Sequence, residues 1–440
     1  MADHGRADPA RRAAYDLLRA VATRSAYANL VLPKLLRDRG LGGRDAAFAT
    51  ELGYGTLRAQ GTLDAVVASG AGRDLSTVDD DALDVLRLGA YQLLRMRVPA
   101  HAAVSATVDL ASRRATGFVN AVLRKISQRS YDEWVDLVAP SYEDDPIGHL
   151  AIRYAHPPWI VAAFRDALGG DLKETAVALA ADDAPPAVHL VARGDRDSLA
   201  AEVGGEPGPW SPYAVHLGGG DPARLPAVRE GRARVQDEGS QLVALAAAAA
   251  PIEGADTRWL DLCAGPGGKA ALLGQLAGPR GARVTANEPL PHRAELTRAA
   301  CAGLPVDVVE ADGTAGEWRD YDRVLVDAPC SGLGALRRRP EARWRRRPTD
   351  IPELTALQRR LLTAALAACR PGGVVMYATC SPHLAETRAV VAEVVRREGA
   401  VQLDARELFP GIPDLGDGPT VQLWPHRHGT DAMFVAALRR

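Results

Sequence analysis

The chain has 440 residues, more than one compact core usually supports, so two or three domains are expected. Hydrophobic residues make up 47% and charged residues 25%, which excludes a chain that is disordered throughout. The formal net charge of -2 excludes a globally basic nucleic-acid binder, so an RNA-binding surface would have to come from local clusters of arginine.

The cellular location and the redox state also follow from composition. The N-terminal charges are not followed by an apolar stretch, and the most apolar segment, residues 242–251, is too short to span a bilayer. We therefore expect a cytoplasmic protein without a membrane partner. The five cysteines are too few for a disulfide framework and none stands in CxxC spacing, so we expect reduced thiols and no metal.

The first predicted domain, residues 1–138, is all-α. In residues 80–96 apolar side chains recur every three or four positions, the period of one buried helical face, at Leu83, Leu86, Ala90, Leu93 and Leu94. Residues 117–126 repeat the pattern, and Arg124 and Lys125 lie off its apolar face. No strand pattern interrupts these helices.

The second predicted domain, residues 139–232, is a small α+β linker. Its segments GGEPGPWSP and LGGGDPARLP are rich in loop-forming residues, whereas PAVHLVAR has the pattern of a strand.

The third predicted domain, residues 233–440, is an α/β fold of the Rossmann-like type. Short apolar runs alternate with helical patterns, which predicts βαβ units and a parallel sheet with helices on both faces. These runs are TRWLDLCAG, ARVTANE, VDVVEAD, YDRVLVDAP and GGVVMYATC. Ligands bind such a sheet at the carboxyl ends of its strands, where the acidic residues of these runs fall.

A nucleotide-type ligand is predicted at the glycine-rich turn DLCAGPGGK, residues 261–269. Glycines let the backbone approach a ligand, and the following helix N-terminus presents free N–H groups. Glu288, about 20 residues beyond the turn, can accept both hydroxyls of a ribose, and Asp312 can hold an adenine amino group. The alternatives are a tight turn without ligand and two solvated carboxylates. A nicotinamide cofactor is less consistent, because the turn lacks GxGxxG spacing.

Two cysteines follow neighbouring strands of the predicted sheet. Cys330 stands in DAPCSG and Cys380 in ATCSP, so both would face the same pocket. Cys301 and Cys369, the latter within a helical pattern, are expected to be buried core residues, and Cys263 is given no chemical role.

The motifs DAPCSG and ATCS, in this order, resemble those of the Nop/Sun family of RNA 5-methylcytosine methyltransferases. LDLCAGPGGK and VQDEGSQ support the resemblance, and FATELGYGTLR and FVNAVLRK resemble the NusB-like domain of its bacterial Sun/Fmu branch. The resemblance covers nearly the whole chain. It implies an all-α NusB-like RNA-binding domain, a class I S-adenosylmethionine-dependent methyltransferase domain, and a monomeric enzyme acting on small-subunit (16S) ribosomal RNA.

The resemblance also implies residue roles. Cytosine C5 is a weak nucleophile, so a thiolate must first add to C6, and the resemblance gives this role to Cys380. It assigns Cys330 to assisting release of the product and Asp327 to bonding the N3/N4 edge of the base, which must be out of any stack. S-adenosylmethionine would contact Cys263, Ala264, Gly265, Pro266, Gly267, Gly268, Lys269, Glu288, Asp312 and Asp327. Glu288 replaces the commoner Asp of the family.

An arginine run surrounds Trp344 directly after the Cys330 loop, at residues 337–347. A charge run is usually a solvated surface, but beside a catalytic loop guanidiniums can pair with phosphates and Trp344 can stack a base. The predicted RNA contacts are Arg338, Arg339, Arg343, Trp344, Arg124 and Lys125; for the last two, ordinary solvated positions are an equal alternative.

Three alternatives remain beside this hypothesis. The same chemistry could act on transfer RNA, although the NusB-like domain argues against it by resemblance. DNA cytosine methylation is less consistent, because those enzymes use the cysteine after proline as nucleophile. An RNA-binding assembly factor without activity would have no physical need of two thiols in one pocket.

Overall fold

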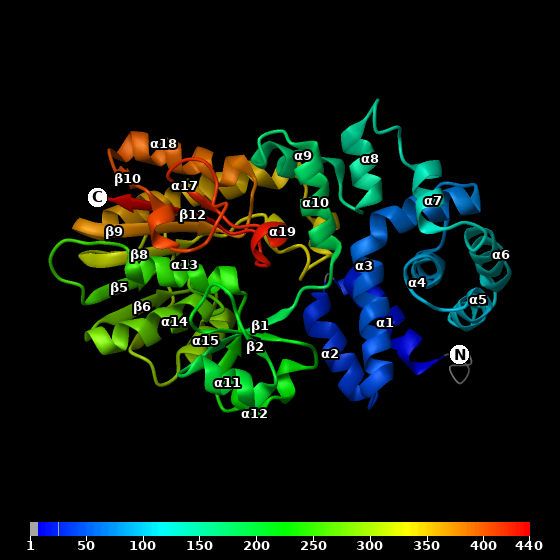
Figure 1. The fold of residues 1–440 in the computed structure, drawn as a ribbon, viewed down its shortest axis with the longest axis horizontal. Helices are drawn as coiled ribbons and strands as arrows, with labels where there is room; N and C mark the ends of the chain where they lie inside the picture. The colour runs from blue at the N-terminus through cyan, green and yellow to red at the C-terminus, as the bar shows by residue number, and fades with distance from the viewer. Residues whose placement is uncertain (1–7, 25) are drawn as a thin grey trace. The chain divides into compact units, whose positions relative to one another are not determined.

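The computed structural model describes residues 8–24 and 26–440, and Figure 1 labels its elements. The chain forms two compact units. The first comprises Met1–Pro185 and Leu336–Arg345, and the second comprises Pro186–Ala335 and Arg346–Arg440. Residues 1–7 of the predicted first domain lie outside the described residues. The expectation that no apolar stretch follows the N-terminal charges rests partly on them.

The first unit is built from helices, as the sequence predicts. They are α1 (Pro9–Arg24), α2 (Ala28–Asp38), α3 (Gly43–Ala71), α4 (Asp80–Arg95), α5 (Ala100–Val108), α6 (Thr116–Ile126), α7 (Tyr131–Val138), α8 (Pro146–Arg153), α9 (Pro158–Ala167), α10 (Leu172–Asp183) and α16 (Ala342–Arg345). None of the helices among the described residues of the whole chain is long and apolar enough to cross a membrane.

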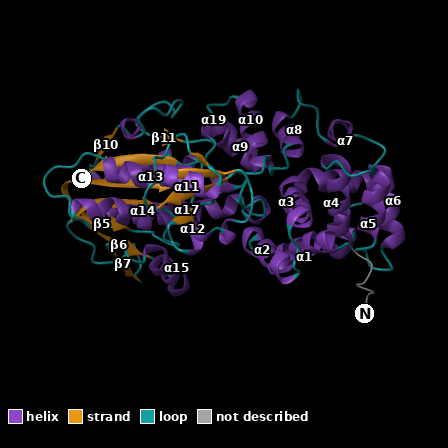
Figure 2. Ribbon diagram, turned by 60° about the horizontal axis from the view of Figure 1, so that its bottom comes forward, coloured by secondary structure: helices purple, strands orange, loops and turns teal. Residues whose placement is uncertain are grey.

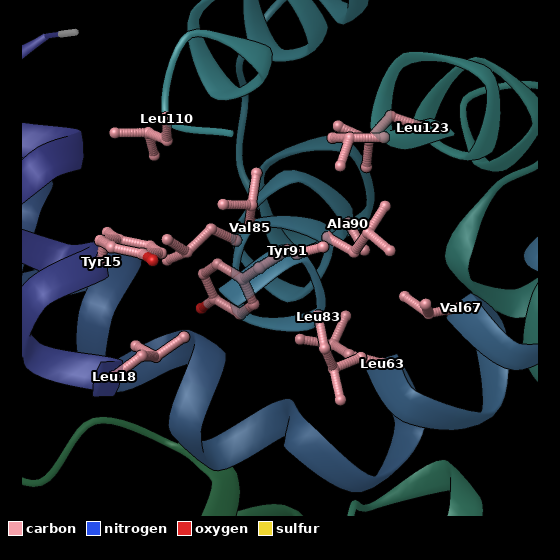
Figure 3. Close-up of a cluster of buried hydrophobic side chains, with 14 of the residues drawn as sticks. Tyr15, Leu18, Leu63, Val67, Leu83, Val85, Ala90, Tyr91, Leu110 and Leu123 are labelled. Carbon is pink, nitrogen blue, oxygen red and sulfur yellow. The ribbon is translucent and has the colours of Figure 1, made fainter. Parts of the chain in front are cut away.

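The apolar periodicity of α4 explains the core of this unit. Leu83 and Ala90 are buried in one cluster with Leu63 and Val67 of α3, and Figure 3 shows these side chains among their neighbours. Spacing of three or four residues places such side chains on one face of a helix, so the predicted stripe of α4 packs inward. Arg124, on α6, stays exposed off its stripe.

The segment Leu336–Arg345 is anchored in the first unit by Arg343. This side chain is fully buried, and its guanidinium donates to the carbonyl oxygens of Arg58 (2.8 Å), Ala155 (3.3 Å) and Asp182 (3.0 Å) and to Asp183 Oδ1 (2.7 Å). The prediction of an RNA contact at Arg343 is wrong, because the side chain is fully buried and both of its NH2 groups donate to protein acceptors. A planar guanidinium with five N–H donors suits such a cluster of carbonyls.

The second unit begins with a small antiparallel sheet in the order β2-β3-β1-β4. Its strands are β1 (Val188–Ala192), β2 (Glu206–Pro207), β3 (Ala214–Leu217) and β4 (Ala233–Val235), accompanied by helices α11 (Arg196–Val203) and α12 (Pro226–Arg229). Strand β1 confirms the strand predicted in PAVHLVAR.

The larger sheet of the second unit has the order β10-β12-β9-β8-β5-β6-β7, with β11 paired to β12. Strands β9, β8, β5, β6 and β7 are parallel, whereas β10, β11 and β12 run antiparallel at one edge. The strands are β5 (Arg258–Asp261), β6 (Arg283–Asn287), β7 (Val306–Val309), β8 (Tyr321–Asp327), β9 (Cys369–Thr379), β10 (Val401–Leu403), β11 (Val421–Gln422) and β12 (Phe434–Arg439). The predicted Rossmann-like fold is confirmed.

Helices cover both faces of this sheet, as Figure 2 shows. On one face α13 (Glu238–Ala249) and α14 (Gly268–Ala277) pack on Trp259, Leu325 and Met376. On the other, α17 (Ile351–Ala368) and α18 (Arg388–Glu398) pack on Leu260 and Val326, with Tyr377. Consecutive strand residues thus point to opposite helical layers, which is why these strands are apolar runs rather than alternating ones.

Two sequence expectations need comment. Cys369 is buried as expected, but it begins strand β9 instead of ending a helix. The compact units divide the predicted linker at Pro185, so α8–α10 belong to the first unit and β1–β4 to the second. The three-domain division at 138 and 232 stays a prediction.

Replacing Arg343 by alanine should destabilise the first unit strongly. The change leaves the Asp183 carboxylate, whose pKa burial already raises, without its cation, and such a broken pair typically costs about 3–5 kcal/mol. Urea unfolding followed by circular dichroism would measure the loss. Arg339→Ala, in the same segment but exposed, is the matched control and should change the free energy of unfolding by less than about 1 kcal/mol. Equal effects of the two changes would contradict the assignment.

Candidate active site

The carboxyl ends of β5 and β6 form the edge at which the predicted ligand turn lies. The turn runs from Leu262 to Gly267 and leads into α14. Asn287 joins neighbouring segments: its Nδ2 donates to Leu262 O at 3.0 Å, and its Oδ1 accepts from Ala311 N at 3.1 Å. Gly267 has a φ of 102°, and a Cβ there would lie 2.8 Å from Thr297 Cα, so only glycine fits.

Glu288 lies directly over the turn. Its side chain is buried, Oε1 accepts the Leu290 N–H at 3.0 Å, and Arg293 Nε lies 3.4 Å from Oε2. A Cβ on Gly265 would come within 2.0 Å of Glu288 Oε2. The bare backbone of Gly265 therefore leaves room for this carboxylate. Arg293, which also donates to Gly265 O at 2.6 Å, was not identified from the sequence.

Asp312 occupies a more open position beyond β7. It is exposed, and its Oδ1 accepts the backbone N–H and the hydroxyl of Thr314, both at 2.8 Å. These bonds, the backbone one first, lower the pKa of the Asp312 carboxyl. The residue is thus held as an ionised acceptor at the strand ends.

The two cysteines meet, as their strands predict. Their Sγ atoms are 3.5 Å apart, and both side chains are half-buried. The hydrogen bond with Cys380, together with burial, raises the pKa of Cys330 well above its usual value. Cys330 is therefore a neutral thiol beside Cys380.

A cation and two carboxylates stand next to this pair. Lys269 Nζ donates to Asp327 Oδ2 at 2.8 Å. Burial alone would lower the pKa of Lys269, but Asp327, and after it Cys380 and Asp261, raise it overall. Lys269 is thus an ammonium within electrostatic range of Cys380, where positive charge favours a thiolate.

Asp261 is a site residue that sequence analysis did not select. It ends β5 and is fully buried. Burial, followed by repulsion from Asp327, raises the pKa of Asp261 to about 7. Its position at the end of the first strand, immediately before the glycine-rich turn, was the available signal.

The predicted RNA contacts lie in different surroundings within the first unit. Arg124, Lys125 and Arg339 are exposed, and Arg338 is half-buried. Trp344 packs closely on α3, as its distance from Gly61 shows: a Cβ on Gly61 would lie 2.5 Å from the Trp344 ring. This packing argues against the predicted base stacking by Trp344.

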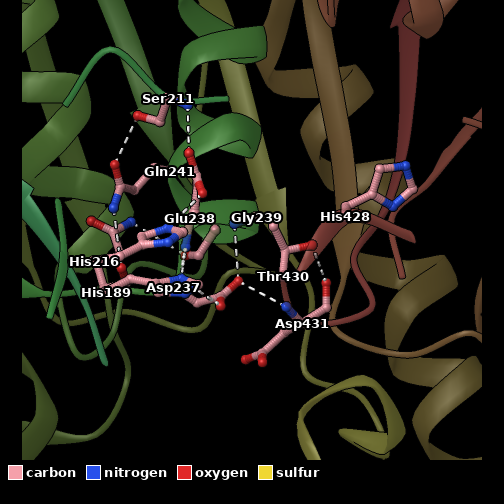
Figure 4. Close-up of polar contacts among 12 residues, drawn as sticks. His189, Ser211, His216, Asp237, Glu238, Gly239, Gln241, His428, Thr430 and Asp431 are labelled. Atoms are coloured by element: carbon pink, nitrogen blue, oxygen red, sulfur yellow. Dashed lines mark hydrogen bonds and ion pairs between the residues drawn. The ribbon is translucent and has the colours of Figure 1, made fainter. Parts of the chain in front are cut away.

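The VQDEGSQ segment forms a hydrogen-bond network, drawn in Figure 4. Glu238 Oε1 accepts the N–H groups of Trp210 (2.8 Å) and Ser211 (2.7 Å), and its Oε2 lies 2.8 Å from His216 Nε2. The rings of His189 and His216 stack with centroids 3.9 Å apart and 10° between their planes. Because the two rings are parallel, their in-plane nitrogen lone pairs do not converge on one metal ion. We therefore assign this cluster to holding α13 against the small sheet.

The same segment reaches the loop of Cys380. Asp237 Oδ1 accepts the N–H of Asp431 at 3.0 Å, and the next residue, Ala432, donates its N–H to Gly334 O at 2.8 Å. Gly334 in turn donates to Cys380 O at 2.9 Å. A Cβ on Gly334 would lie 2.1 Å from Ala432 O, so glycine is required where these backbones meet.

Known proteins share both the domains and the length of this chain. Residues 248–439 match the model of the 16S rRNA methyltransferase RsmB/F family, and residues 8–128 match the NusB family. A probable ribosomal RNA small subunit methyltransferase B of Bacillus subtilis is 30% identical over 94% of this chain and 95% of its own. The chain belongs to the RsmB/F family. It is an S-adenosylmethionine-dependent RNA methyltransferase.

Further proteins are similar over most of this chain. A putative methyltransferase of Mycobacterium tuberculosis (strain H37Rv) is 60% identical, covering 98% of this chain and 97% of its own. The crystal structure of PH0851 has the same fold, with a TM-score of 0.80 at 21% identity over 98% of both chains. NSun6 from Pyrococcus horikoshii with SFG matches with a TM-score of 0.56 at 19% identity, over 64% of this chain and 98% of its own.

The strand ends fit the cofactor of this RsmB/F enzyme. A nucleoside with a charged amino-acid tail needs a fixed acceptor for ribose hydroxyls and a backbone without side chains. The buried Glu288 carboxylate would supply the first, and the turn around Gly265 would supply the second. When bound, S-adenosylmethionine supplies a methyl group on a positively charged sulfur.

Replacing Gly265 by alanine should weaken cofactor binding by at least about tenfold, equivalent to about 1.4 kcal/mol. The new Cβ would displace Glu288, whose Oε2 lies 2.0 Å from its position. Isothermal titration with S-adenosylmethionine would measure the dissociation constant. Gly218→Ala, outside the site at a position with ordinary φ and open space around it, is the control. Unchanged affinity in Gly265→Ala would show that Glu288 does not need its present position.

Replacing Asp261 by asparagine should alter the dependence of stability on pH. Because the pKa of Asp261 in the folded protein, about 7, exceeds the value near 3.8 of an ordinary aspartate, the native state binds more protons between these values. Wild-type stability should therefore fall as pH rises from about 4 to 7, whereas the variant escapes this loss, by up to about 4 kcal/mol at pH 8. Thermal unfolding from pH 4 to 8 would test this. Asp307→Asn, the same substitution at an exposed position, is the control.

Proposed function

We propose that this chain methylates C5 of a cytosine in small-subunit ribosomal RNA through a covalent bond between Cys380 Sγ and C6. The observation that carries the proposal is the contact of Cys330 and Cys380, 3.5 Å apart, beside the Lys269–Asp327 pair. An enzyme that transferred a methyl group to a nucleophilic nitrogen or oxygen would have no need of these thiols.

The reaction begins with Cys380. Its thiolate, favoured by the nearby Lys269 ammonium, adds to C6 and pushes electron density to C5, which then acts as the nucleophile. Asp327, fixed by Lys269, accepts a hydrogen bond from the N4 amino group and orients the ring. The target base must be unstacked for the sulfur to reach its face.

Release of the product reverses the addition. The C5 proton passes to solvent, its bonding electrons restore the C5–C6 double bond, and the C6–S bond breaks to return the thiolate. Cys330 is a neutral thiol 3.5 Å from this sulfur, so it can donate a hydrogen bond to Cys380 Sγ as the sulfur leaves. This is the physical basis for assigning Cys330 to release.

Separate sets of residues are proposed for the cofactor and for the RNA. Residues 263–269 and Glu288 would hold S-adenosylmethionine, with Asp312 toward the adenine amino group. Arg339, Arg124 and Lys125 remain proposed phosphate contacts because they are exposed cations, and Arg338, which is half-buried, remains proposed beside Arg339 in the same basic segment. A role in ribosomal RNA maturation would place the enzyme in the cytoplasm. We expect it to act as a monomer.

Ribosomal RNA is preferred over transfer RNA because relatives similar over nearly the whole chain carry the name of small-subunit ribosomal RNA methyltransferases. An inactive assembly factor is disfavoured because it would not need Cys330, Cys380 and Asp327 in one place.

The Cys330→Ala variant should accumulate a covalent complex with RNA. Addition through Cys380 continues, but release slows because the neighbouring thiol is gone. Purified variant, small-subunit ribosomal RNA and S-adenosylmethionine would be separated on a denaturing gel, and a shifted band is expected. It should vanish in Cys330→Ala/Cys380→Ala.

Two controls sharpen this experiment. Cys301→Ala, at a buried position outside the site, should behave as wild type. Transfer RNA in place of ribosomal RNA should give no band. Trapping by Cys380→Ala instead would reverse the roles of the two thiols. The absence of both a shifted band and methyl transfer with every RNA tested would favour the binding-protein alternative.

A further inference from the structure

One buried carboxylate connects the loops of both cysteines. Glu386 lies in a 3-10 turn after β9, Leu384–Glu386, and its side chain is fully buried. The proposed reaction does not use it. Its two oxygens nevertheless accept hydrogen bonds from residues adjacent to both Cys330 and Cys380.

On the Cys330 side the carboxylate binds the next residue in the chain. Oε1 accepts the backbone N–H of Ser331 at 2.7 Å, and Oε2 accepts the hydroxyl of Ser331. Gln358 Nε2 bridges the other side of the loop, donating to Pro329 O at 2.9 Å and to Glu386 Oε1 at 3.1 Å. The backbone is thus held both before and after Cys330.

On the Cys380 side the contact is again with the following residue. Ser381 Oγ donates to Glu386 Oε2 at 2.7 Å and lies 3.1 Å from Ser331 Oγ. Tyr377, on β9, donates its hydroxyl to the backbone carbonyl of Glu386 at 2.7 Å, which fixes the turn that carries the carboxylate. Both serines are buried.

The donors around Glu386 define what can stand at this position. Two hydroxyls, one backbone N–H and one amide N–H point at the same group, and an ionised carboxylate accepts at both oxygens without donating. A glutamine would place an NH2 group against hydroxyls that now donate. An alanine would leave buried donors without an acceptor.

We propose that Glu386 is a positioning residue that sets the separation of the Cys330 and Cys380 sulfurs by clamping the serine after each cysteine. Cys330 and Cys380 both lie beyond the ends of their strands, so the β8–β9 ladder does not by itself fix the two loops. The clamp supplies that constraint. The inference rests on the proposed function for its kinetic consequences, but not for its geometric ones.

The separation can be measured without RNA. Diamide oxidises two adjacent thiols to a disulfide and is itself reduced to the hydrazine, so its rate reports how often the sulfurs meet. With the wild type, a Cys330–Cys380 disulfide should form readily and be located by peptide mass spectrometry. In Glu386→Ala its rate should fall at least about tenfold, because loops freed by about 1 Å lose close approach. Ser331→Ala/Ser381→Ala, which removes both hydroxyl donors, should fall in the same direction.

The kinetic readout separates positioning from folding and binding. In Glu386→Ala kcat should fall about 10- to 100-fold, whereas KM for RNA and the dissociation constant for S-adenosylmethionine change less than about twofold. Glu386→Gln, which keeps one acceptor oxygen, should recover part of kcat. Glu393→Gln on α18, where the carboxylate is half-exposed and pairs with Arg359, is the matched control and should equal wild type.

An unchanged diamide rate in Glu386→Ala and in the double serine variant, measured on folded protein, would overturn the proposal. So would a loss of kcat matched by an equal loss of folded fraction or of RNA affinity. Failure of wild-type protein to methylate or trap RNA would instead contradict the proposed function. The diamide comparison needs no RNA, so it would still test the positioning role of Glu386.

Discussion

The parallel pairing of β8 with β9 is the constraint on which the site depends. Val326 lies opposite Tyr377 and Asp327 opposite Ala378, so both strands end at the same edge of the sheet. The pairing brings Cys330 and Cys380, 50 positions apart in the chain, to the same edge, where their sulfurs lie 3.5 Å apart. The ladder is buried between two helical layers, so a shift in its register would move apolar side chains out of both cores as well as separate the thiols.

One ammonium group in the site faces several acidic groups. The Lys269 ammonium is shared by Asp327, Asp261 and Cys380, and the raised pKa of Asp261 shows that it does not satisfy every neighbour. Burying carboxylates near the cofactor turn costs stability. In the proposed reaction the same charges orient a cytosine and favour a thiolate, so the reaction would benefit from charges that cost stability.

The arginine run shows how little composition says about the use of a side chain. In Leu336–Arg345, Arg339 is exposed, with its guanidinium over the Tyr27 ring, whereas Arg343 is fully buried among carbonyl oxygens. Arg346, just beyond, donates to Ser331 O at 3.1 Å and so belongs to the surroundings of Cys330. A run predicted as one RNA-binding surface is divided among three structural settings.

The sequence alone determined the alternation of strands and helices, the helical N-terminal unit and the pairing of the two cysteine motifs, because these follow from local periodicity and from residues placed at strand ends. Only the tertiary structure decided the surroundings of Arg343, Trp344, Asp261 and Glu386. Burial and hydrogen-bond partners come from segments distant in the chain: Arg343 meets Arg58, and Glu386 meets Ser331. The sequence does not show whether water or protein surrounds a carboxylate or guanidinium. Those surroundings set its pKa and its function.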